Sequence, residues 1–213
     1  MGTVALIDYG SGNVHSAARA LTRAAEGAKH GLRVTLTADP DVVTRADRVV
    51  LPGVGHFADC KREIDRRDGL TEALESAVIA RGAPFLGICV GMQLMADFGA
   101  EDGDHRGFGW IHGRVEALRG GPGLRIPHMG WNEVMPRGAH PVLAELGQDA
   151  HAYFVHSYAF SPENEHEIAA VTDHGQPFVS AVGRDNLFGT QFHPEKSQAV
   201  GLKILTNFLN WRP

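Results

Sequence analysis

The sequence predicts an α/β fold: a three-layer sandwich in which a central, mostly parallel mixed sheet carries helices on both faces. In the first half of the chain, short apolar runs alternate with amphipathic stretches, the rhythm of βαβ units and parallel strands. From residue 113 onward, short strand-like segments separated by turn residues predominate. This second pattern predicts antiparallel strands added to the sheet.

The first half predicts strands and helices in alternation. The expected elements are, in order, a strand at 3–8, a helix at 13–28, strands at 32–37 and 48–51, a helix at 70–81 and a strand at 85–88. The helix at 13–28 is amphipathic, since Val14, Ala17 and Leu21 recur at helical spacing.

The second half predicts mainly strands, closed by one helix. Strands are expected at 113–117, 131–135, 153–159, 168–172, 178–183 and 187–192, and a helix at 198–211. No internal repeat and no Pro/Gly/Ser-rich linker divides the sequence, so residues 1–213 are expected to form one domain.

Composition excludes several functional classes. A formal charge of −5 argues against a nucleic-acid backbone or an anionic membrane as the main partner. Two cysteines give no disulfide framework, which suits a reducing compartment. The sequence has neither a signal-peptide pattern at its start nor an apolar run of membrane length. We therefore expect a cytoplasmic protein.

One segment, Gly87-Ile88-Cys89-Val90-Gly91, fits a cysteine placed in a strand-to-helix elbow. Glycines on both sides of Cys89 permit a tight turn that lifts its side chain above the sheet. The N-terminal end of the following helix would favour thiolate, the nucleophilic form. The competing interpretation is a buried core cysteine, since free cysteines are usually interior.

A second motif, near the C-terminus, gives this cysteine chemical partners. The strand expected at 187–192 ends in His193-Pro194-Glu195. Proline keeps the preceding residue extended, and residues two apart in an extended segment project to the same side. Glu195 can therefore lie beside His193, although either residue alone would be interpreted as a solvated surface group. A nucleophile, a base and a carboxylate that orients the base form a catalytic triad.

Two loops lie where active sites gather in such sheets, beyond the carboxyl ends of strands. Glycines in Pro52-Gly53-Val54-Gly55 allow a backbone that presents N–H groups to an oxyanion, and the elbow offers the Val90 N–H for the same purpose. A plain turn is the alternative for residues 52–55. The loop at 8–13 is only a weak candidate for an anion-binding loop, since it lacks the lysine of a P-loop and the spacing of a dinucleotide fingerprint.

The twelve histidines form no metal-binding pattern in the sequence. Neither a His-Glu-x-x-His helix nor a cysteine–histidine zinc spacing occurs. We therefore expect no metal and no cofactor. Cys60 lies in a polar helical stretch at 57–64 and is interpreted as an incidental thiol.

Together these residues carry a family resemblance. Gly87-x-Cys89-x-Gly91-x-Gln93, Pro52-Gly53-x-Gly55 and His193-Pro194-Glu195 resemble the class I (triad) glutamine amidotransferases over essentially the whole chain. Within that class, the chain is most similar to the glutaminase subunits of imidazole glycerol phosphate synthase, in histidine biosynthesis. The segments that carry this similarity are 7–13, 52–55, 127–132, 154–158 and 189–197. Departures are Val90 in place of a common leucine, His56 in place of a small residue, and a longer 26–33 segment.

The resemblance implies a division of roles for glutamine hydrolysis. Cys89 attacks the carboxamide, His193 protonates the departing ammonia, and Glu195 orients the imidazolium. The implied oxyanion donors are the backbone N–H groups of Val90, Gly53 and Val54, and the implied substrate-binding residues are Gln93, His156, Ser157 and Tyr158.

The resemblance also implies a partner, because free ammonia would be lost to water or protonated to inert ammonium. That partner is a (β/α)₈-barrel cyclase subunit, which receives the ammonia through a tunnel. Glutamine and a phosphoribulosyl-formimino aminoimidazole carboxamide ribonucleotide then yield imidazole glycerol phosphate, an aminoimidazole carboxamide ribonucleotide and glutamate. The implied partner-facing residues are Asn13, Trp131, Tyr153 and Lys196, of which Trp131 and Tyr153 would otherwise be interpreted as core aromatics.

Three alternatives remain open at this point. The first is the glutaminase subunit of another amidotransferase complex, for anthranilate or vitamin B6 synthesis, against which 127–132 and the opening loop argue. The second is a DJ-1-like or peptidase-like cysteine hydrolase, which Gln93 and the His-Pro-Glu spacing disfavour. The third is a non-catalytic scaffold subunit, which the intact Cys89, His193 and Glu195 disfavour.

Overall fold

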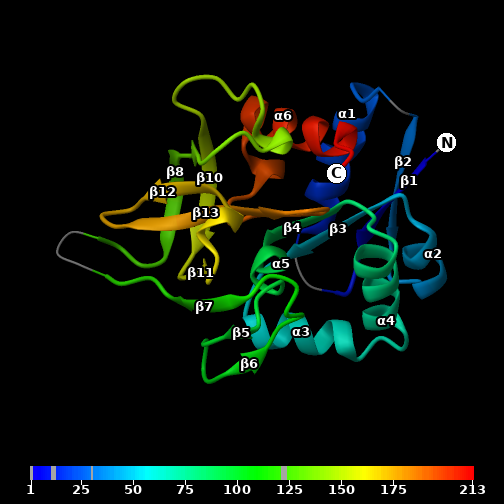
Figure 1. Ribbon diagram of the computed structural model, residues 1–213, viewed down its shortest axis with the longest axis horizontal. Helices are drawn as coiled ribbons and strands as arrows, with labels where there is room; N and C mark the ends of the chain where they lie inside the picture. The colour runs from blue at the N-terminus through cyan, green and yellow to red at the C-terminus, as the bar shows by residue number, and fades with distance from the viewer. Residues whose placement is uncertain (1, 11–12, 30, 121–123) are drawn as a thin grey trace.

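The centre of the molecule is a mixed sheet with the strand order β2-β1-β3-β4-β14-β13-β12-β9 (Figure 1). The computed structural model describes residues 2–10, 13–29, 31–120 and 124–213, so Ser11 and Gly12 of the loop at 8–13 lie outside the described residues. The strands are β1 (Gly2–Ile7), β2 (Leu32–Thr37), β3 (Arg48–Gly53), β4 (Phe85–Cys89), β9 (Met135–Pro136), β12 (Ile168–Asp173), β13 (Pro177–Arg184) and β14 (Leu187–Thr190). Neighbours from β2 to β14 are parallel, and β13, β12 and β9 continue the sheet antiparallel.

Helices cover both faces of this sheet (Figure 1). On one face α1 (Val14–Glu26) packs against α6 (Gln198–Asn210). On the other face lie α2 (Pro40–Arg45), α3 (Phe57–Asp65) and α4 (Leu70–Leu74). The predicted three-layer α/β sandwich is therefore confirmed. None of the helices in the described part of the chain has the length and apolar character needed to cross a membrane.

Two helical segments differ from the sequence-based expectation. The helix expected at 70–81 consists of α4 followed by a π-helical turn, η1 (Glu75–Ala80). The short helix α2 was not predicted, because six residues show too little periodicity. The sequence nevertheless contains two helix-start signals. The side chain of Asp39 accepts from the backbone N–H of Asp41 as an N-cap, and Pro40 occupies a first-turn position.

The second half of the chain builds two further small sheets beside the central one. β10 (His151–His156) pairs with β8 (His128–Glu133), and β11 (Tyr158–Pro162) belongs to a sheet of order β11-β7-β5-β6 with β7 (Gly113–Ala117), β5 (Phe98–Gly99) and β6 (His105–Arg106). The expected antiparallel additions to the central sheet are present as β12 and β13, whereas β7, β8, β10 and β11 belong to the two small sheets. The strand expected at 153–159 breaks at Ser157, where the chain passes from one small sheet to the other.

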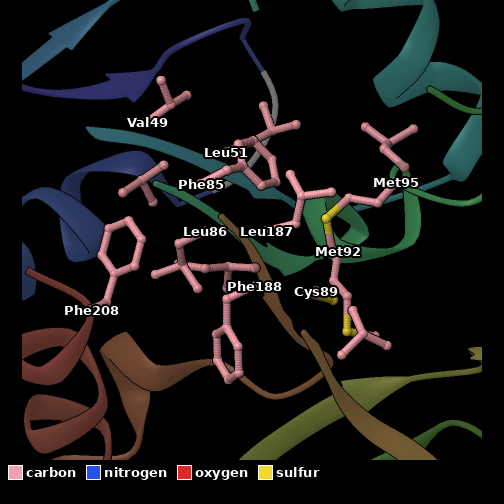
Figure 2. Packing of buried hydrophobic residues seen from close by; sticks show 14 of the residues in the cluster. Val49, Leu51, Phe85, Leu86, Cys89, Met92, Met95, Leu187, Phe188 and Phe208 are labelled. Carbon is pink, nitrogen blue, oxygen red and sulfur yellow. The ribbon is translucent and has the colours of Figure 1, made fainter. Parts of the chain in front are cut away.

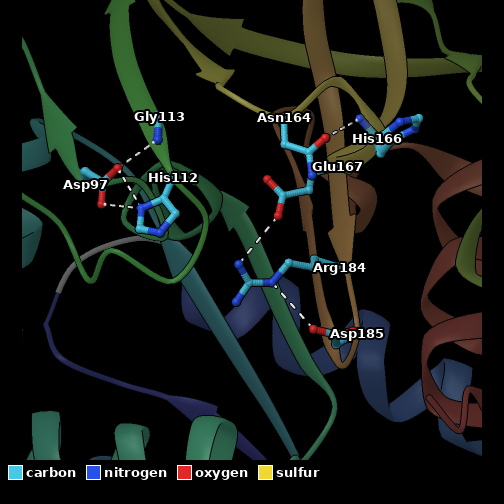
Figure 3. Close-up of polar contacts among 8 residues, drawn as sticks. All are labelled: Asp97, His112, Gly113, Asn164, His166, Glu167, Arg184 and Asp185. Carbon is cyan, nitrogen blue, oxygen red and sulfur yellow. Dashed lines mark hydrogen bonds and ion pairs between the residues drawn. The ribbon is translucent and has the colours of Figure 1, made fainter.

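A carboxylate anchors the small sheet that contains β11, the strand that begins at Tyr158. Oδ2 of Asp97 accepts from the backbone N–H of Gly113 at 2.9 Å, and Nδ1 of His112 lies 3.1 Å from its Oδ1 (Figure 3). Asp97 directly precedes β5 and Gly113 begins β7, so the carboxylate joins two paired strands. Since β7 pairs with β11, this contact helps to fix the backbone at Tyr158.

Strand β4 lies between β3 and β14 in the middle of the central sheet. Its residues Phe85 and Leu86 are fully buried among the side chains of β14 and α6, including Phe188 and Phe208 (Figure 2). Close packing of this kind leaves a strand little freedom to move. The end of β4, where Cys89 lies, is therefore held in place by the core.

Candidate active site

Cys89 occupies a strained turn at the junction of β4 and the one-turn helix α5 (Val90–Gln93). Its backbone has φ 54° and ψ −112°, a conformation that costs a non-glycine residue about 1–3 kcal/mol. Such strain persists only where the surroundings enforce it, and it is common at functional sites. The predicted elbow is present, but a single helical turn offers the thiolate less dipole stabilisation than a long helix would.

The glycines of the elbow serve close packing. A Cβ at Gly91 would collide with the carbonyl oxygen of Leu51, and one at Gly87 would lie 2.5 Å from the carbonyl oxygen of Gly91. The positive φ falls on Cys89 itself, whereas Gly87 and Gly91 lie outside that region. The Gly-x-Cys-x-Gly spacing thus reflects how tightly the elbow packs against β3.

His193 and Glu195 lie side by side after β14. Nδ1 of His193 is 2.8 Å from Oε1 of Glu195, and the two side chains are only 2% and 5% exposed. Burial favours the neutral imidazole, but interactions with Cys89 and Glu195 outweigh it and raise the pKa of His193 to about 10. Because Nδ1 is occupied by Glu195, Nε2 is the nitrogen that remains for Cys89.

A cavity of about 240 Å³ opens in front of Cys89. The predicted residues that line it are Val54, Cys89, Val90, Gln93, His156, Ser157, Tyr158 and His193. Gly53 and Glu195 lie behind this wall, against the elbow and against His193 respectively. Pockets for drug-sized ligands are roughly 300–1,000 Å³, so this cavity suits a single small metabolite.

The predicted oxyanion loop contacts the elbow directly. Gly53 pairs with Cys89 across β3 and β4, and a Cβ on it would lie 2.8 Å from the backbone nitrogen of Gly91. Val54 is 44% exposed, and its carbonyl oxygen accepts from Sγ of Cys60 at 3.6 Å. Cys60 is therefore a buried thiol of α3 beside this loop, although its segment is polar in sequence.

The predicted substrate-binding residues contribute different atoms to the cavity. Nε2 of Gln93 donates to the carbonyl oxygen of Tyr158 and to Oε1 of Gln191, each at 3.0 Å. Its own Oε1 is therefore the atom left for a ligand. The imidazole of His156 is turned inward, with Nδ1 donating to Tyr158 O at 2.9 Å. His156, Ser157 and Tyr158 line the cavity where the chain passes from β10 to β11.

The predicted partner-facing residues lie outside the cavity. Trp131 is 48% exposed, so the interpretation as a core aromatic does not hold for it. Its ring centroid lies 6.1 Å from that of Tyr153, and Lys196 Nζ lies 5.7 Å from the Tyr153 ring centroid. Asn13 caps α1 by accepting from the backbone N–H of Ser16. α1 in turn packs against the helical turn Pro194–Lys196.

Sequence reasoning missed three polar residues at or behind the wall of the cavity. Gln191 donates from Nε2 to Cys89 Sγ at 3.6 Å, Glu101 lines the cavity, and His128 bonds to His156. Glu101 also accepts from the backbone N–H of Phe57 at 2.9 Å. The departure at His56 contacts this same carboxylate, with Nδ1 3.4 Å from Glu101 Oε1. Gln191 and His128 lie in segments that carry the family resemblance, 189–197 and 127–132, whereas Glu101 had no sequence signal.

The arrangement contains no candidate metal centre in the part of the chain that the structure describes, because no three His, Cys, Asp or Glu side chains there gather closely enough to hold an ion. The groups gathered at the cavity are the thiol of Cys89, the imidazole of His193 and backbone N–H groups.

Comparison with known proteins gives a consistent family assignment. The family model for class-I glutamine amidotransferases matches residues 5–211. The HisH subunit of imidazole glycerol phosphate synthase from Rhodospirillum rubrum is 53% identical over 212 residues, covering 99% of each chain. The HisH subunit from Caulobacter vibrioides is 51% identical over 214 residues, covering 100% of each chain.

Solved structures share the fold at lower identity. A crystal structure of a glutamine amidotransferase aligns with a TM-score of 0.70 at 18% identity, covering 94% of this chain and 95% of that one. A glutamine amidotransferase from Thermotoga maritima aligns with a TM-score of 0.63 at 16% identity, covering 91% of this chain and 76% of that one. With a family model that spans nearly its whole length and full-length relatives at about half identity, the chain belongs to the class-I glutamine amidotransferases and, within them, to the HisH subunits of imidazole glycerol phosphate synthase.

Proposed function

We propose that this chain hydrolyses glutamine with a Cys89–His193–Glu195 triad and delivers the ammonia to a cyclase subunit. The cyclase then makes imidazole glycerol phosphate and aminoimidazole carboxamide ribonucleotide. The observation that carries the proposal is the buried His193, bonded to Glu195 at 2.8 Å and interacting with a strained cysteine at the wall of a small cavity. The 53% identity to a HisH subunit over nearly the full length of both chains supports the same assignment.

The first half-reaction forms a covalent intermediate. The Cys89 thiolate adds to the glutamine carboxamide carbon, and the developing oxyanion is met by the Val90 N–H and by the backbone at Gly53 and Val54. Because its pKa is raised to about 10, His193 is protonated at neutral pH and can give its proton to the leaving ammonia. Glu195 holds the ring and stabilises the imidazolium.

The second half-reaction releases glutamate. Neutral His193 takes a proton from water as the water attacks the glutamyl thioester. The carbon–sulfur bond then breaks, its electron pair returns to sulfur, and the thiolate–imidazolium pair is restored. Within the cavity, the Glu101 carboxylate and Gln93 Oε1 are the acceptors for the α-ammonium group of glutamine.

The partner-facing surface supports docking of a cyclase subunit. Met129 is 63% exposed and Trp131 48% exposed, both on β8, and large exposed side chains grouped on one strand indicate an interaction site. Behind them, the backbone N–H of His193 donates to the carbonyl oxygen of Tyr153 at 2.9 Å. This hydrogen bond joins β10, the strand that pairs with β8, to the triad.

A Cys89→Ala variant tests the proposal. In the complex with the cyclase, it should lose glutamine-driven synthesis of imidazole glycerol phosphate and keep the reaction driven by added ammonium salt. Glutamine-driven turnover in this variant would remove Cys89 from the mechanism. Loss of both reactions, with the complex still intact by gel filtration, would show that the subunit does more than supply ammonia. Peptide substrates offered to the wild type would separate the amidotransferase from a cysteine peptidase.

A further inference from the structure

A buried glutamine outside the triad contacts the nucleophilic sulfur. Gln191 is fully buried one residue after β14, and its Nε2 lies 3.6 Å from Cys89 Sγ. His193 approaches the same cysteine, so the sulfur has an imidazole ring and an amide as neighbours. Nothing in the mechanism above uses this amide.

The neighbouring hydrogen bonds fix which end of the amide faces the sulfur. The carbonyl oxygen of Tyr158 can only accept, so Gln93 must present its NH₂ group to it, at 3.0 Å. The other N–H of that group then meets Oε1 of Gln191, also at 3.0 Å. With its oxygen engaged by Gln93, Gln191 presents its own NH₂ group to Cys89. A reversed amide would place two donors, or an oxygen and a thiolate, against each other.

We propose that Gln191 is a further catalytic residue, whose side-chain N–H stabilises negative charge on the Cys89 sulfur and which Gln93, bonded to Tyr158, holds in the required orientation. The proposal rests on the proposed role of Cys89 as nucleophile. The donor matters because α5 is a single turn and adds little dipole stabilisation.

The donor acts at two points of the reaction. It favours thiolate in the resting enzyme, before the carbon–sulfur bond forms. It also meets the charge that returns to sulfur when water has added to the thioester and the carbon–sulfur bond breaks. In the glutamyl thioester itself the sulfur is neutral. The N–H therefore stabilises the thiolate before the thioester forms and again when the thioester is hydrolysed.

Two variants of the full chain separate the donor from its packing. Gln191→Met keeps the length of the side chain without any donor, and Gln191→Glu keeps an acceptor for Gln93 while replacing the donor by a carboxylate. Gln148→Met, at an exposed glutamine, is the matched control. The first readout is the pH at which iodoacetamide alkylation of Cys89 reaches half its maximal rate, followed by mass mapping of the peptide. The second is kcat for glutamine hydrolysis in the cyclase complex.

We expect the alkylation midpoint to rise by about one pH unit in Gln191→Met and further in Gln191→Glu, because a hydrogen bond to a charged group is worth roughly tenfold or more. The same reasoning predicts a fall in kcat of roughly tenfold to a hundredfold, with a smaller change in KM. Gln148→Met should match wild type. Ammonium-driven synthesis should persist in every variant, which establishes folding and docking.

The possible outcomes distinguish the two proposals. An unchanged midpoint in both variants overturns the role of Gln191, whether or not kcat falls, since packing alone would then explain the loss. A wild-type complex without glutaminase activity overturns the proposed function, and a shifted midpoint in that case still supports the contact between Gln191 and the sulfur.

Discussion

Nδ1 of His128 and Nε2 of His156 lie 3.0 Å apart in the interior between β8 and β10. His156 Nδ1 donates to Tyr158 O, so its Nε2 must accept, and His128 Nδ1 is the donor. Asn132 completes the chain by donating to His128 Nε2 at 3.2 Å. Both rings must be neutral, because an extra proton on either would set two N–H groups against each other. The chain joins the strand that carries Trp131 to the wall of the glutamine cavity.

Because both rings are neutral in the folded state, we expect the protein to lose folding stability in mild acid. Burial, with the neighbouring histidines, lowers the pKa of His156 to about 3, and burial lowers that of His128 to about 4. The unfolded chain takes up these protons near pH 6.5. The contribution to stability is therefore complete above that pH and is lost as the pH falls toward 4 and 3. For His156 the slope is at most about 1.4 kcal/mol per pH unit.

Urea unfolding between about pH 6.5 and about pH 5 measures this slope, in a window above most carboxylate titrations. His193 adds little there, because its raised pKa keeps it protonated in the folded state while the unfolded state is also protonating. His156→Gln should flatten the dependence, and His151→Gln, at an exposed position, should not. Equal slopes for wild type and His156→Gln would mean that the pair is not neutral in the folded state.

The triad residues should differ in how much activity they carry. His193→Ala removes the acid–base group, and we expect a loss of at least roughly 10²–10⁴-fold in glutamine hydrolysis by the complex. Glu195→Gln should cost less, because an amide oxygen still accepts from Nδ1 but does not stabilise the imidazolium charge as well. Steady-state glutamate release gives both numbers. A larger loss in Glu195→Gln than in His193→Ala would contradict the assigned roles.

The docking surface should depend on Trp131. Trp131→Ala removes a half-exposed aromatic ring, and truncation of such an anchor typically weakens binding by about 2 kcal/mol or more, roughly thirtyfold. Titration calorimetry with the cyclase subunit measures the change. Ile79→Ala is the matched control, since Ile79 is 46% exposed but belongs to η1, away from β8. Equal effects of the two variants would place the partner elsewhere.

The features predicted correctly from sequence are those with local signals. The elbow at Cys89 is a strand, a glycine-flanked residue and a helical start in direct succession. The contact between His193 and Glu195 is likewise set by two residues of spacing across a proline. The parallel half of the sheet follows from the alternation of apolar runs and amphipathic helices.

The features that were missed depend on contacts between distant segments. Gln191 meets Cys89 across 102 positions and Gln93 across 98, and no spacing rule connects them. The break at Ser157 depends on strand pairing: His156 pairs with β8 and Tyr158 with β7, so one apolar run serves two sheets. The burial of Cys60 was missed because most residues of α3 are polar. Only Phe57, Cys60 and Ile64 of this helix face the core.

The last prediction is that the isolated chain is a poor glutaminase, which its partner activates. The backbone at Val54 and Gly55, beyond the end of β3, can reorient, because Gly55 has φ +109° with open space where a Cβ would lie and Val54 is half exposed. One misplaced oxyanion donor costs about 10²–10³ in rate. The cyclase and its nucleotide can restore that donor only by binding the competent loop conformation more tightly.

Glutamate release should therefore rise stepwise from the chain alone, to the chain with cyclase, to the complex with the cyclase's nucleotide substrate. Gly55→Ala provides the internal check, because a Cβ strains the loop at a positive φ whatever space surrounds it. Because this strain falls on the loop conformation of the free chain, the variant should change the ratios between the three rates, while Cys89 still reacts with iodoacetamide as in wild type. Equal rates for the wild type in the three states would mean that the oxyanion site is already formed in the free subunit, and that ammonia release is not coupled to its use.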